Sequence, residues 1–230
     1  MIFLLGDTHD PNTFLKKISE LEKRYQPAKN DYVVVLGDFG LLFALQETVF
    51  EKLALQAANE KLYKVLFIDG NHENFPRLLA ESMDCNFGGS IARQLTKYKN
   101  IIWLQRGCCY HIDNKKILTF GGGTSIDKAY RVPDISWWEE ENILDHDIEK
   151  YKETIKKYGK DYDYIFTHTA PTSFASRCII PYFDDRNSDI LEKLLHDGLS
   201  FKKWYFGHYH VEKDAEKWRC LYDEIVKIER

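Results

Sequence analysis

The sequence lacks the features that mark several large classes of protein. No apolar run approaches the length of a membrane span, and no basic stretch and cleavable apolar core precede the first strand-like run. The formal charge of −4 and the pI near 6.1 give no general attraction to nucleic acids or anionic membranes. We therefore expect a soluble cytoplasmic protein with no membrane partner. Nucleic acid is not favoured as a partner, although a local basic patch could still bind it.

Cysteine is scarce and shows no pairing pattern. The chain has five cysteines, an odd number, and none of them forms a C-x-x-C pair. A disulfide framework is therefore not indicated, and we expect reduced thiols. Cys108 and Cys109 are neighbours in a strand-like segment, where we expect one to lie in the core and the other at the edge.

The chain does have enough apolar material for a large core. Its 230 residues are 44% hydrophobic and 14% aromatic, which favours a core built around two sheet layers. No internal repeat, low-complexity tract or flexible linker interrupts the sequence. We therefore expect residues 1–230 to form one domain.

The first seventy residues alternate between strand-like and helix-like patterns. Apolar runs at Ile2–Leu5, Tyr32–Leu36 and Lys64–Ile68 predict strands. The segments Asn12–Arg24 and Ala44–Glu60 predict helices between them. The second of these helices has one apolar face, formed by Leu45, Val49, Leu53 and Ala57. A β-α-β-α-β order indicates a parallel sheet covered by helices, and ligands of such sheets collect at the carboxyl ends of the strands.

The middle of the chain has a different character. Short β-type runs separated by turn residues, with Asp113-Asn114 as a hairpin turn, indicate an antiparallel section and a second sheet packed on the first. A loop, Thr124–Ser136, precedes an acidic helix expected from Trp137 to Tyr158. The remaining expected elements are strands at Asn100–Leu104, Cys108–Ile112, Lys116–Phe120, Tyr164–Phe166 and Trp204–Phe206, a helix near Ser188–His196, and two closing strands, Lys217–Tyr222 and Glu224–Ile228, that turn at Tyr222-Asp223.

Short polar clusters directly follow five of the apolar runs, and they hold five of the eight histidines together with carboxylates and an asparagine amide. The clusters are Gly6-Asp7-Thr8-His9-Asp10, Gly37-Asp38-Phe39-Gly40, Gly70-Asn71-His72-Glu73, Thr167-His168-Thr169-Ala170-Pro171 and Gly207-His208-Tyr209-His210. Nitrogen and oxygen donors delivered from several strand ends to one edge of a sheet are what a metal site needs.

The spacing within the clusters suits two metal ions. Asp7 and His9 are separated by one residue, so in an extended segment both side chains can point to the same side, and the histidine pair of the last cluster repeats that spacing. The candidate ligands are Asp7, His9, Asp38, Asn71, His168, His208 and His210. Seven donors are too many for one tetrahedral ion but suit two ions that share a carboxylate. Because thiolates are absent from the set, Mn, Fe, Zn or Ni is favoured over structural zinc.

A cationic two-metal site in a cleft binds phosphate, and its usual chemistry is in-line displacement between ions about 3.5–4 Å apart. The ordered series D-x-H, GD, GNH[ED], a histidine after a strand, and GHxH resembles the calcineurin-like metallophosphoesterase superfamily, in particular its small bacterial and phage-type members. The series runs from residue 6 to residue 210. The resemblance implies an α/β fold with four αββα layers, in which helices flank two mixed β-sheets.

The resemblance also implies roles for the cluster residues. One divalent ion would be held by Asp7, His9 and His210, the other by Asn71, His168 and His208, and Asp38 would bridge both. His72 would act on the substrate instead of a metal, as a general acid or a stabiliser of the developing charge. A hydroxide bridging the two ions would attack phosphorus in line with the leaving group.

The substrate class is left open by the sequence. The chain lacks the D-R-G continuation of the Ser/Thr protein phosphatase branch after Asp38, which argues against that assignment. The expected substrate is a small phosphorylated molecule or nucleotide, as a phosphomonoester or phosphodiester. A nuclease or cyclic-nucleotide phosphodiesterase within the family remains an alternative. A non-catalytic metal-binding interaction module of the same fold is another.

The segment from Gly121 to Trp138 is rich in groups suited to a substrate rim. Arg131 is the candidate phosphate contact, because guanidinium can grip phosphate with two hydrogen bonds. Trp137 and Trp138 could stack on a base, but packing is the simpler interpretation of both. Asp10 is expected to cap the helix that begins near Pro11, and Glu73 to be a first-turn acid of another helix. His111, His146 and His196 are taken as structural or solvated.

Overall fold

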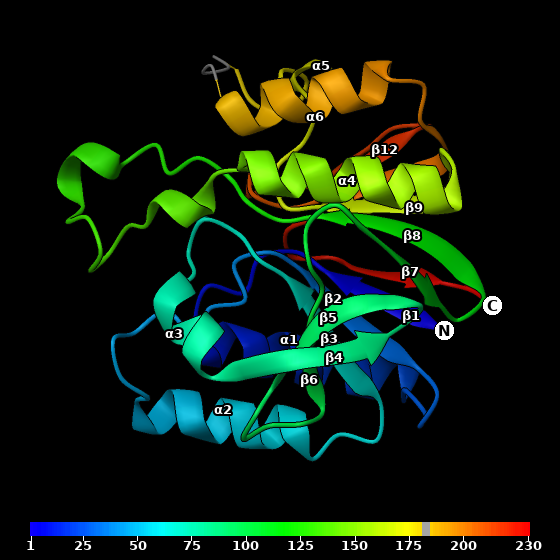
Figure 1. Ribbon diagram of the computed structural model, residues 1–230. Helices are drawn as coiled ribbons and strands as arrows, with labels where there is room; N and C mark the ends of the chain where they lie inside the picture. Colours follow the sequence, from blue (N-terminus) through cyan, green and yellow to red (C-terminus); the bar gives the residue numbers. More distant parts are fainter. Residues whose placement is uncertain (181–184) are drawn as a thin grey trace.

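The computed structural model describes residues 1–180 and 185–230. Two β-sheets pack face to face, and helices cover the outer face of each, so the layers run αββα (Figure 1). The predicted fold class is therefore confirmed. In strand order, the first sheet is β13-β1-β2-β3-β6-β5-β4 and the second is β11-β12-β10-β9-β8-β7.

The elements have the following bounds. The strands of the first sheet are β1 Ile2–Leu5, β2 Tyr32–Leu36, β3 Lys64–Ile68, β4 Ser82–Phe87, β5 Ser90–Leu95, β6 Ile101–Trp103 and β13 Ile225–Ile228. Those of the second are β7 Cys108–Ile112, β8 Lys115–Phe120, β9 Asp161–Thr167, β10 Ser200–Phe206, β11 Lys213–Asp214 and β12 Trp218–Cys220. The helices are α1 Pro11–Tyr25, α2 Val49–Asn59, α3 Phe75–Ala80, α4 Asp145–Tyr158, α5 Thr172–Ala175 and α6 Arg186–His196, with 3-10 turns at Lys128–Tyr130 and Glu139–Glu141.

Each sheet contains a set of neighbouring parallel strands, and the carboxyl ends of both sets point toward the same region of the molecule. In the first sheet β1, β2, β3 and β6 are parallel neighbours, and in the second β8, β9, β10 and β12 are. The last strand of the chain, β13, pairs antiparallel with β1 and closes that edge. Residues that follow the parallel strands therefore emerge where the two sheets meet, which positions the five polar clusters.

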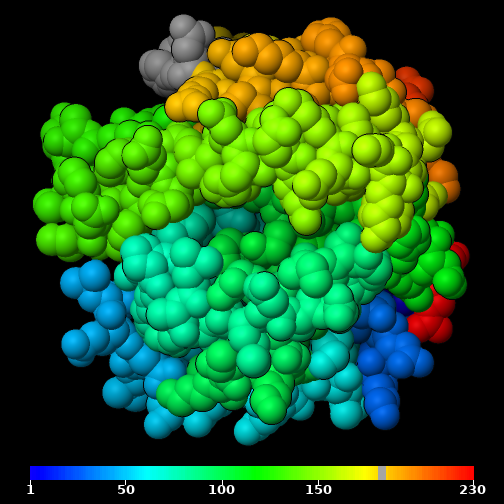
Figure 2. Space-filling model, viewed as in Figure 1, coloured from blue at the N-terminus to red at the C-terminus, as the bar shows by residue number. Residues whose placement is uncertain are grey.

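Alternation along the strands builds three apolar layers. In β1, Ile2 and Leu4 face the second sheet, whereas Phe3 and Leu5 face helices α1 and α2. A third layer lies between the second sheet and helices α4 and α6, around Tyr151, and these two helices form one side of the molecular surface (Figure 2). Cys108 and Cys109 illustrate the same alternation, because one lies between the sheets and the other under α4. Both are buried, so the expectation of one core and one edge cysteine is wrong.

Helix α1 starts as expected. Asp10 accepts hydrogen bonds from the backbone N–H groups of Asn12 and Thr13, and Pro11 takes the first helical position.

The five cysteines are free thiols. Within the described ranges, no helix has both the length and the apolar character needed to cross a bilayer.

Helix α2 is shorter than predicted and presents a different face to the core. It begins after Thr48, whose side chain forms a capping box with Glu51. Its buried apolar residues are Ala54, Leu55 and Ala58. The predicted apolar face is wrong, since Leu45, Val49 and Leu53 are exposed. The capping box sets where the helix starts, and contact with the sheet, not apolar spacing alone, selects the buried face.

Three further expectations are corrected by long-range contacts. Helix α4 begins at Asp145 instead of Trp137, because Arg106 binds the carbonyl oxygens of Glu140 and Asn142 and holds this stretch outside the helix. The two closing strands do not form a hairpin, since β12 joins the second sheet and β13 joins the first. Strand β6 pairs parallel with β3 in the first sheet, and the β4–β5 hairpin beside it was not predicted. The Asp113-Asn114 turn is confirmed by its positive φ angles of 48° and 61°.

Candidate metal centre

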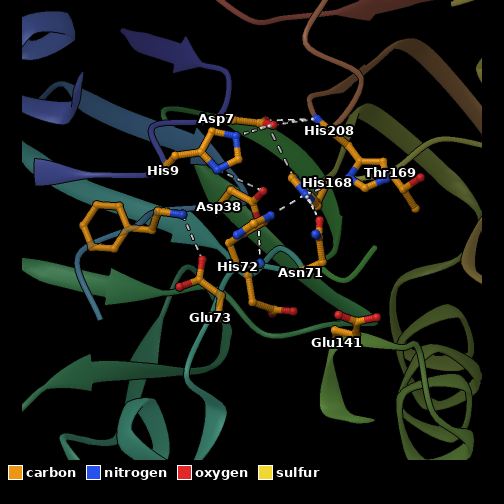
Figure 3. Close-up of polar contacts among 12 residues, drawn as sticks. Asp7, His9, Asp38, Asn71, His72, Glu73, Glu141, His168, Thr169 and His208 are labelled. Carbon is orange, nitrogen blue, oxygen red and sulfur yellow. Dashed lines mark hydrogen bonds and ion pairs between the residues drawn. The ribbon is translucent and has the colours of Figure 1, made fainter. Parts of the chain in front are cut away.

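The five polar clusters meet at one place between the two sheets (Figure 3). The seven candidate ligands identified from the sequence all lie there, and Asp7, Asp38, Asn71 and His168 are buried. Three overlapping groups of side chains bring their nitrogen and oxygen atoms within 4.8 Å of one another, and they share Asp7, His9 and Asp38.

One side of the centre is formed by Asp7, His9 and His210. The Oδ2 atom of Asp7 lies 3.2 Å from Nε2 of His210 and 3.6 Å from Nε2 of His9. The two imidazole Nε2 atoms are 2.8 Å apart. A carboxylate oxygen and two ring nitrogens therefore point at a common space, as ligands of one cation do.

The other side is formed around His168. Its Nε2 atom lies 3.0 Å from Oδ1 of Asn71, 3.2 Å from Nδ1 of His208 and 3.3 Å from Oδ1 of Asp38. Asp38 also reaches the first side, because its Oδ2 atom lies 3.5 Å from Nδ1 of His9. Asp38 thus contacts residues on both sides of the centre.

The hydrogen bond made by Nδ1 of His168 determines whether Nε2 carries a proton in the neutral ring. Nδ1 lies 2.8 Å from the carbonyl oxygen of Leu36, and since a carbonyl only accepts, Nδ1 carries the proton. In the neutral ring, Nε2 then carries a lone pair that faces oxygen atoms of Asn71 and Asp38 and a nitrogen atom of His208. This arrangement is favourable when a positive charge lies there, either as a proton on Nε2 or as a cation bound between the groups. A hydrogen bond from Nδ1–H to a carbonyl is also how proteins orient histidine ligands of metals.

The pKa shifts of residues in the described site also indicate that positive charge is favourable there. Burial opposes a charged His168, but Asp38 and Asp7 outweigh it and raise the pKa of this ring to about 10. Burial raises the pKa of Asp38, but His168, His72 and His9 together outweigh it and hold that pKa below its usual value. The pKa of His208 falls to about 4 because of burial and the neighbouring His168. Divalent ions bound here would supply the required charge, so the donor set fits them.

The backbone reaches this geometry through unusual conformations. Four candidate ligands have left-handed φ angles, namely His9 at 55°, Asp38 at 47°, His208 at 68° and His210 at 51°. Left-handed conformations are unfavourable for residues other than glycine and persist where surrounding contacts hold them, often at functional sites. Asp7 and His9 therefore meet through a tight turn, not through the extended segment that the sequence suggested. The side chains of His208 and His210 diverge, and each points toward a different side of the centre.

Glycine 37 allows the sheets to approach closely at the centre. Its φ is +88°, and a Cβ atom there would lie 2.1 Å from Nδ1 of His168. The Gly37-Asp38 pair thus places a carboxylate next to a histidine from the other sheet. The glycine before the carboxylate is needed for contact between the sheets.

His72 and Arg131 lie together at the open side of the centre. The backbone N–H of His72 donates to Oδ1 of Asp38 at 2.8 Å, and its ring lies 5.0 Å from the ring of His9. Nη2 of Arg131 lies 3.0 Å from Nε2 of His72, while its Nε pairs with Asp127 at 2.7 Å. The structure therefore brings Arg131 to the site, as expected from the sequence. Burial lowers the pKa of His72, although Asp38 raises it.

A cavity of about 600 Å³ opens onto these groups. Apart from the proposed ligands it is lined by His72, Thr124, Ile126, Asp127, Arg131, Ile179, Ile180, Asp185 and Tyr209. Trp137 and Trp138 are not among the lining residues. Trp138 is buried against Phe43, and Trp137 packs under the ammonium of Lys128, so packing is the role that the structure gives both rings.

Several residues near the centre were missed or misplaced from the sequence. Glu73 precedes helix α3, whose N-cap is Asn74, so it is not a first-turn acid. It is fully buried, and its Oε1 accepts the backbone N–H of Phe39. Lys17 donates to the carbonyl oxygens of Asp7 and Tyr222 from beneath the first cluster. A lysine on the buried side of an amphipathic helix was the only available signal for this contact.

A two-sheet sandwich with carboxylate, amide and imidazole groups at its strand ends is the architecture of metallophosphoesterases. The calcineurin-like phosphoesterase family model matches residues 1–212, and the chain belongs to this family. Family membership supports the hydrolysis of phosphoric esters as its general activity.

Comparison with solved structures shows the same fold. One solved chain aligns with 96% of this chain and 88% of its own length, at 12% identity and a TM-score of 0.55. Another, described as a "putative 5'-nucleotidase" from Staphylococcus aureus in complex with alpha-ketoglutarate, aligns with 96% of this chain at 14% identity and a TM-score of 0.51. The alignment covers 48% of that protein, so this chain spans about half of its length. No curated protein matches the chain significantly.

Proposed function

We propose that this protein is a phosphoesterase that depends on two divalent metal ions and hydrolyses a small phosphomonoester or phosphodiester. The observation that carries the proposal is the ring of His168, whose proton lies on the side away from the site. Its Nε2 atom, which carries no proton in the neutral ring, lies 3.0–3.3 Å from side-chain atoms of Asn71, His208 and Asp38. A cation bound among these nitrogen and oxygen atoms would stabilise the set.

The short distances on each side of the centre support a division of the proposed ligands between two ions. Asp7, His9 and His210 would hold one ion, and Asn71, His168 and His208 would hold the other, with Asp38 shared by both. Mn, Fe, Zn and Ni all accept this mixture of imidazole, carboxylate and amide ligands. When bound, the ions supply Lewis acidity toward phosphoryl oxygens and lower the pKa of bound water.

The protein's own groups at the open side would act on the substrate. Arg131 would bind phosphoryl oxygens, for which a guanidinium group is well suited. It already lies beside His72, so a phosphoryl group at that place could contact both side chains. His72 would donate a proton to the leaving oxygen as a general acid. The hydrogen bond from its backbone N–H to Asp38 positions it next to the proposed centre.

The cavity supports a small substrate. Its volume of about 600 Å³ is within the range of about 300–1,000 Å³ typical of small-molecule sites. A nucleotide or a similar small phosphate ester is therefore favoured over a nuclease substrate.

The experiment that tests this function combines metal analysis with a substrate panel. Metal-free protein is titrated with Mn²⁺, Fe²⁺, Zn²⁺ or Ni²⁺ and assayed on p-nitrophenyl phosphate, bis-p-nitrophenyl phosphate, nucleotides and cyclic nucleotides. We expect two ions per chain and hydrolysis of at least one ester. His168→Gln should abolish both properties, whereas His146→Gln, which changes a solvent-exposed histidine, should alter neither. Binding of no metal, or two bound ions without turnover of any ester, would contradict the proposal.

A further inference from the structure

Beside the proposed metal centre, a buried glutamate holds a serine that in turn contacts a proposed ligand. Glu141 is fully buried and lies next to the site (Figure 3). Its Oε2 accepts the hydroxyl of Ser125 at 2.7 Å, and its Oε1 accepts the backbone N–H of the same serine at 3.1 Å. The ammonium of Lys128 lies 2.7 Å from Oε1. The serine oxygen lies 3.0 Å from Nδ2 of Asn71.

The position of the hydroxyl proton gives this contact a direction. A serine hydroxyl has one proton to donate, and here the carboxylate of Glu141 receives it. The oxygen of Ser125 can then only accept toward Asn71, which selects the NH₂ side of the amide. The opposite end, Oδ1, is thereby turned toward His168, at 3.0 Å. An asparagine can bind a metal ion only through this oxygen, so its amide orientation matters.

We infer that Glu141 and Ser125 are positioning residues that hold the Asn71 amide with its oxygen toward the second ion of the centre. The inference rests on the proposed function, because it assumes that Asn71 is a ligand. Outer partners that orient metal ligands typically change metal affinity by about 10- to 100-fold when they are removed. Both residues come from the segment between β8 and α4, which also carries Arg131. One segment would therefore orient a metal ligand and supply the phosphate contact.

The segment is held against the site by further contacts. The backbone N–H of Gly123 donates to the carbonyl oxygen of Glu141 at 3.0 Å. A Cβ atom at Gly123 would lie within 3.0–3.2 Å of atoms in His168, Asn71 and His208. The segment thus packs directly over the three ligands of the second ion, where a change in Ser125 would act on Asn71 first.

The test measures metal affinity in place of turnover. Metal-free wild type, Ser125→Ala and Glu141→Gln are titrated with Mn²⁺ by calorimetry, and their folding is checked by circular dichroism. Ser136→Ala and Glu140→Gln are the matched controls, since they lie in the same segment without contacting Asn71. We expect both test variants to lose about 10- to 100-fold in affinity for one of the two ions. The controls should bind both ions as the wild type does.

Testing Ser125→Ala in a second background, Asn71→Asp, separates an effect on the orientation of the Asn71 amide from a general loosening of the fold. A carboxylate has two equivalent oxygens, so Asn71→Asp removes the need to orient an amide. We therefore expect Ser125→Ala to reduce affinity strongly beside Asn71 but less than about threefold in the Asn71→Asp background. Equal losses in both backgrounds would show that the serine only supports the fold and would overturn the inference.

The remaining outcomes are also decisive. Two ions bound with unchanged affinity in both test variants would refute the inference while leaving the proposed function standing. A wild type that binds no second ion would instead refute the proposed function. If Glu141→Gln does not fold, Ser125→Ala still decides, because it removes a single oxygen from a buried position.

Discussion

Replacement of Arg106 by methionine should destabilise the protein strongly. The guanidinium is buried, and it binds Oδ2 of Asp69 through Nε at 2.8 Å and Oδ2 of Asp147 through Nη1 at 3.3 Å. It also donates to the carbonyl oxygens of Glu140 and Asn142. Methionine would fill much of the space but leave two buried carboxylates without a cation.

The size of the effect follows from the asymmetry of buried ion pairs. Removing one partner typically costs about 3–5 kcal/mol, because the other charge stays buried without compensation. For a chain of 150–250 residues, each kcal/mol changes the melting temperature by about 2–4 °C. The Arg106→Met protein should therefore melt on the order of 10 °C below the wild type. Additional loss of the two carbonyl contacts acts in the same direction.

The assay is thermal and urea unfolding of metal-free protein at neutral pH. Lys152→Met is the comparison, since it removes a charge from an exposed ion pair with Glu149 and should change little. Asp69→Asn combined with Arg106→Met should recover part of the lost stability. A single Arg106→Met variant that unfolds within about 1 kcal/mol of the wild type would show that these carboxylates do not depend on Arg106.

Three further predictions concern individual residues. His72→Ala should cut turnover at least 100-fold while metal content by mass spectrometry stays near that of the wild type, and equal loss of metal would show that its role is misassigned. Gly37→Ala should abolish metal binding and lower the melting temperature, because the added Cβ atom would collide with His168. Gly159→Ala is the control: Gly159 also has a positive φ angle, but the space around it is open, so this variant should bind metal normally. A hydrogen bond from the thiol of Cys220 lowers the pKa of the half-buried Cys178. We therefore expect iodoacetamide to modify Cys178 before the other cysteines and at lower pH, as measured by peptide mapping. Preferential modification of another cysteine would contradict this.

The convergence of the clusters could be predicted because parallel strands deliver their carboxyl ends to one edge. Asp7, Asp38 and Asn71 follow neighbouring strands of the first sheet, so local pattern and βαβ connectivity were sufficient to place them together. His168 and His208 belong to the other sheet. Their approach depends on how the sheets pack, which the family resemblance implied and local sequence did not.

The parts that could not be predicted depend on contacts between distant residues. The start of α4 is set by Arg106, and the burial of Glu141 by Ser125 and Lys128. In the sequence, Glu141 is one of a run of acids that is most simply a solvated helix face. Periodicity reports amphipathic faces and cannot show which charged residue finds a partner in another layer.

The structure also shows why a buried charge cluster can persist beside a polar site. Asp69 lies between strand β3 and the Asn71 cluster, and its carbonyl oxygen accepts the backbone N–H of Gly122 at 3.0 Å. Its side chain binds Arg106, which holds the backbone on both sides of Glu141. A cation in the fold thus restrains the segment that contacts Asn71. Replacing this cluster with apolar residues could preserve stability, but it would remove the hydrogen bonds that set the position of Glu141, so geometry at the centre is a physical reason to retain it.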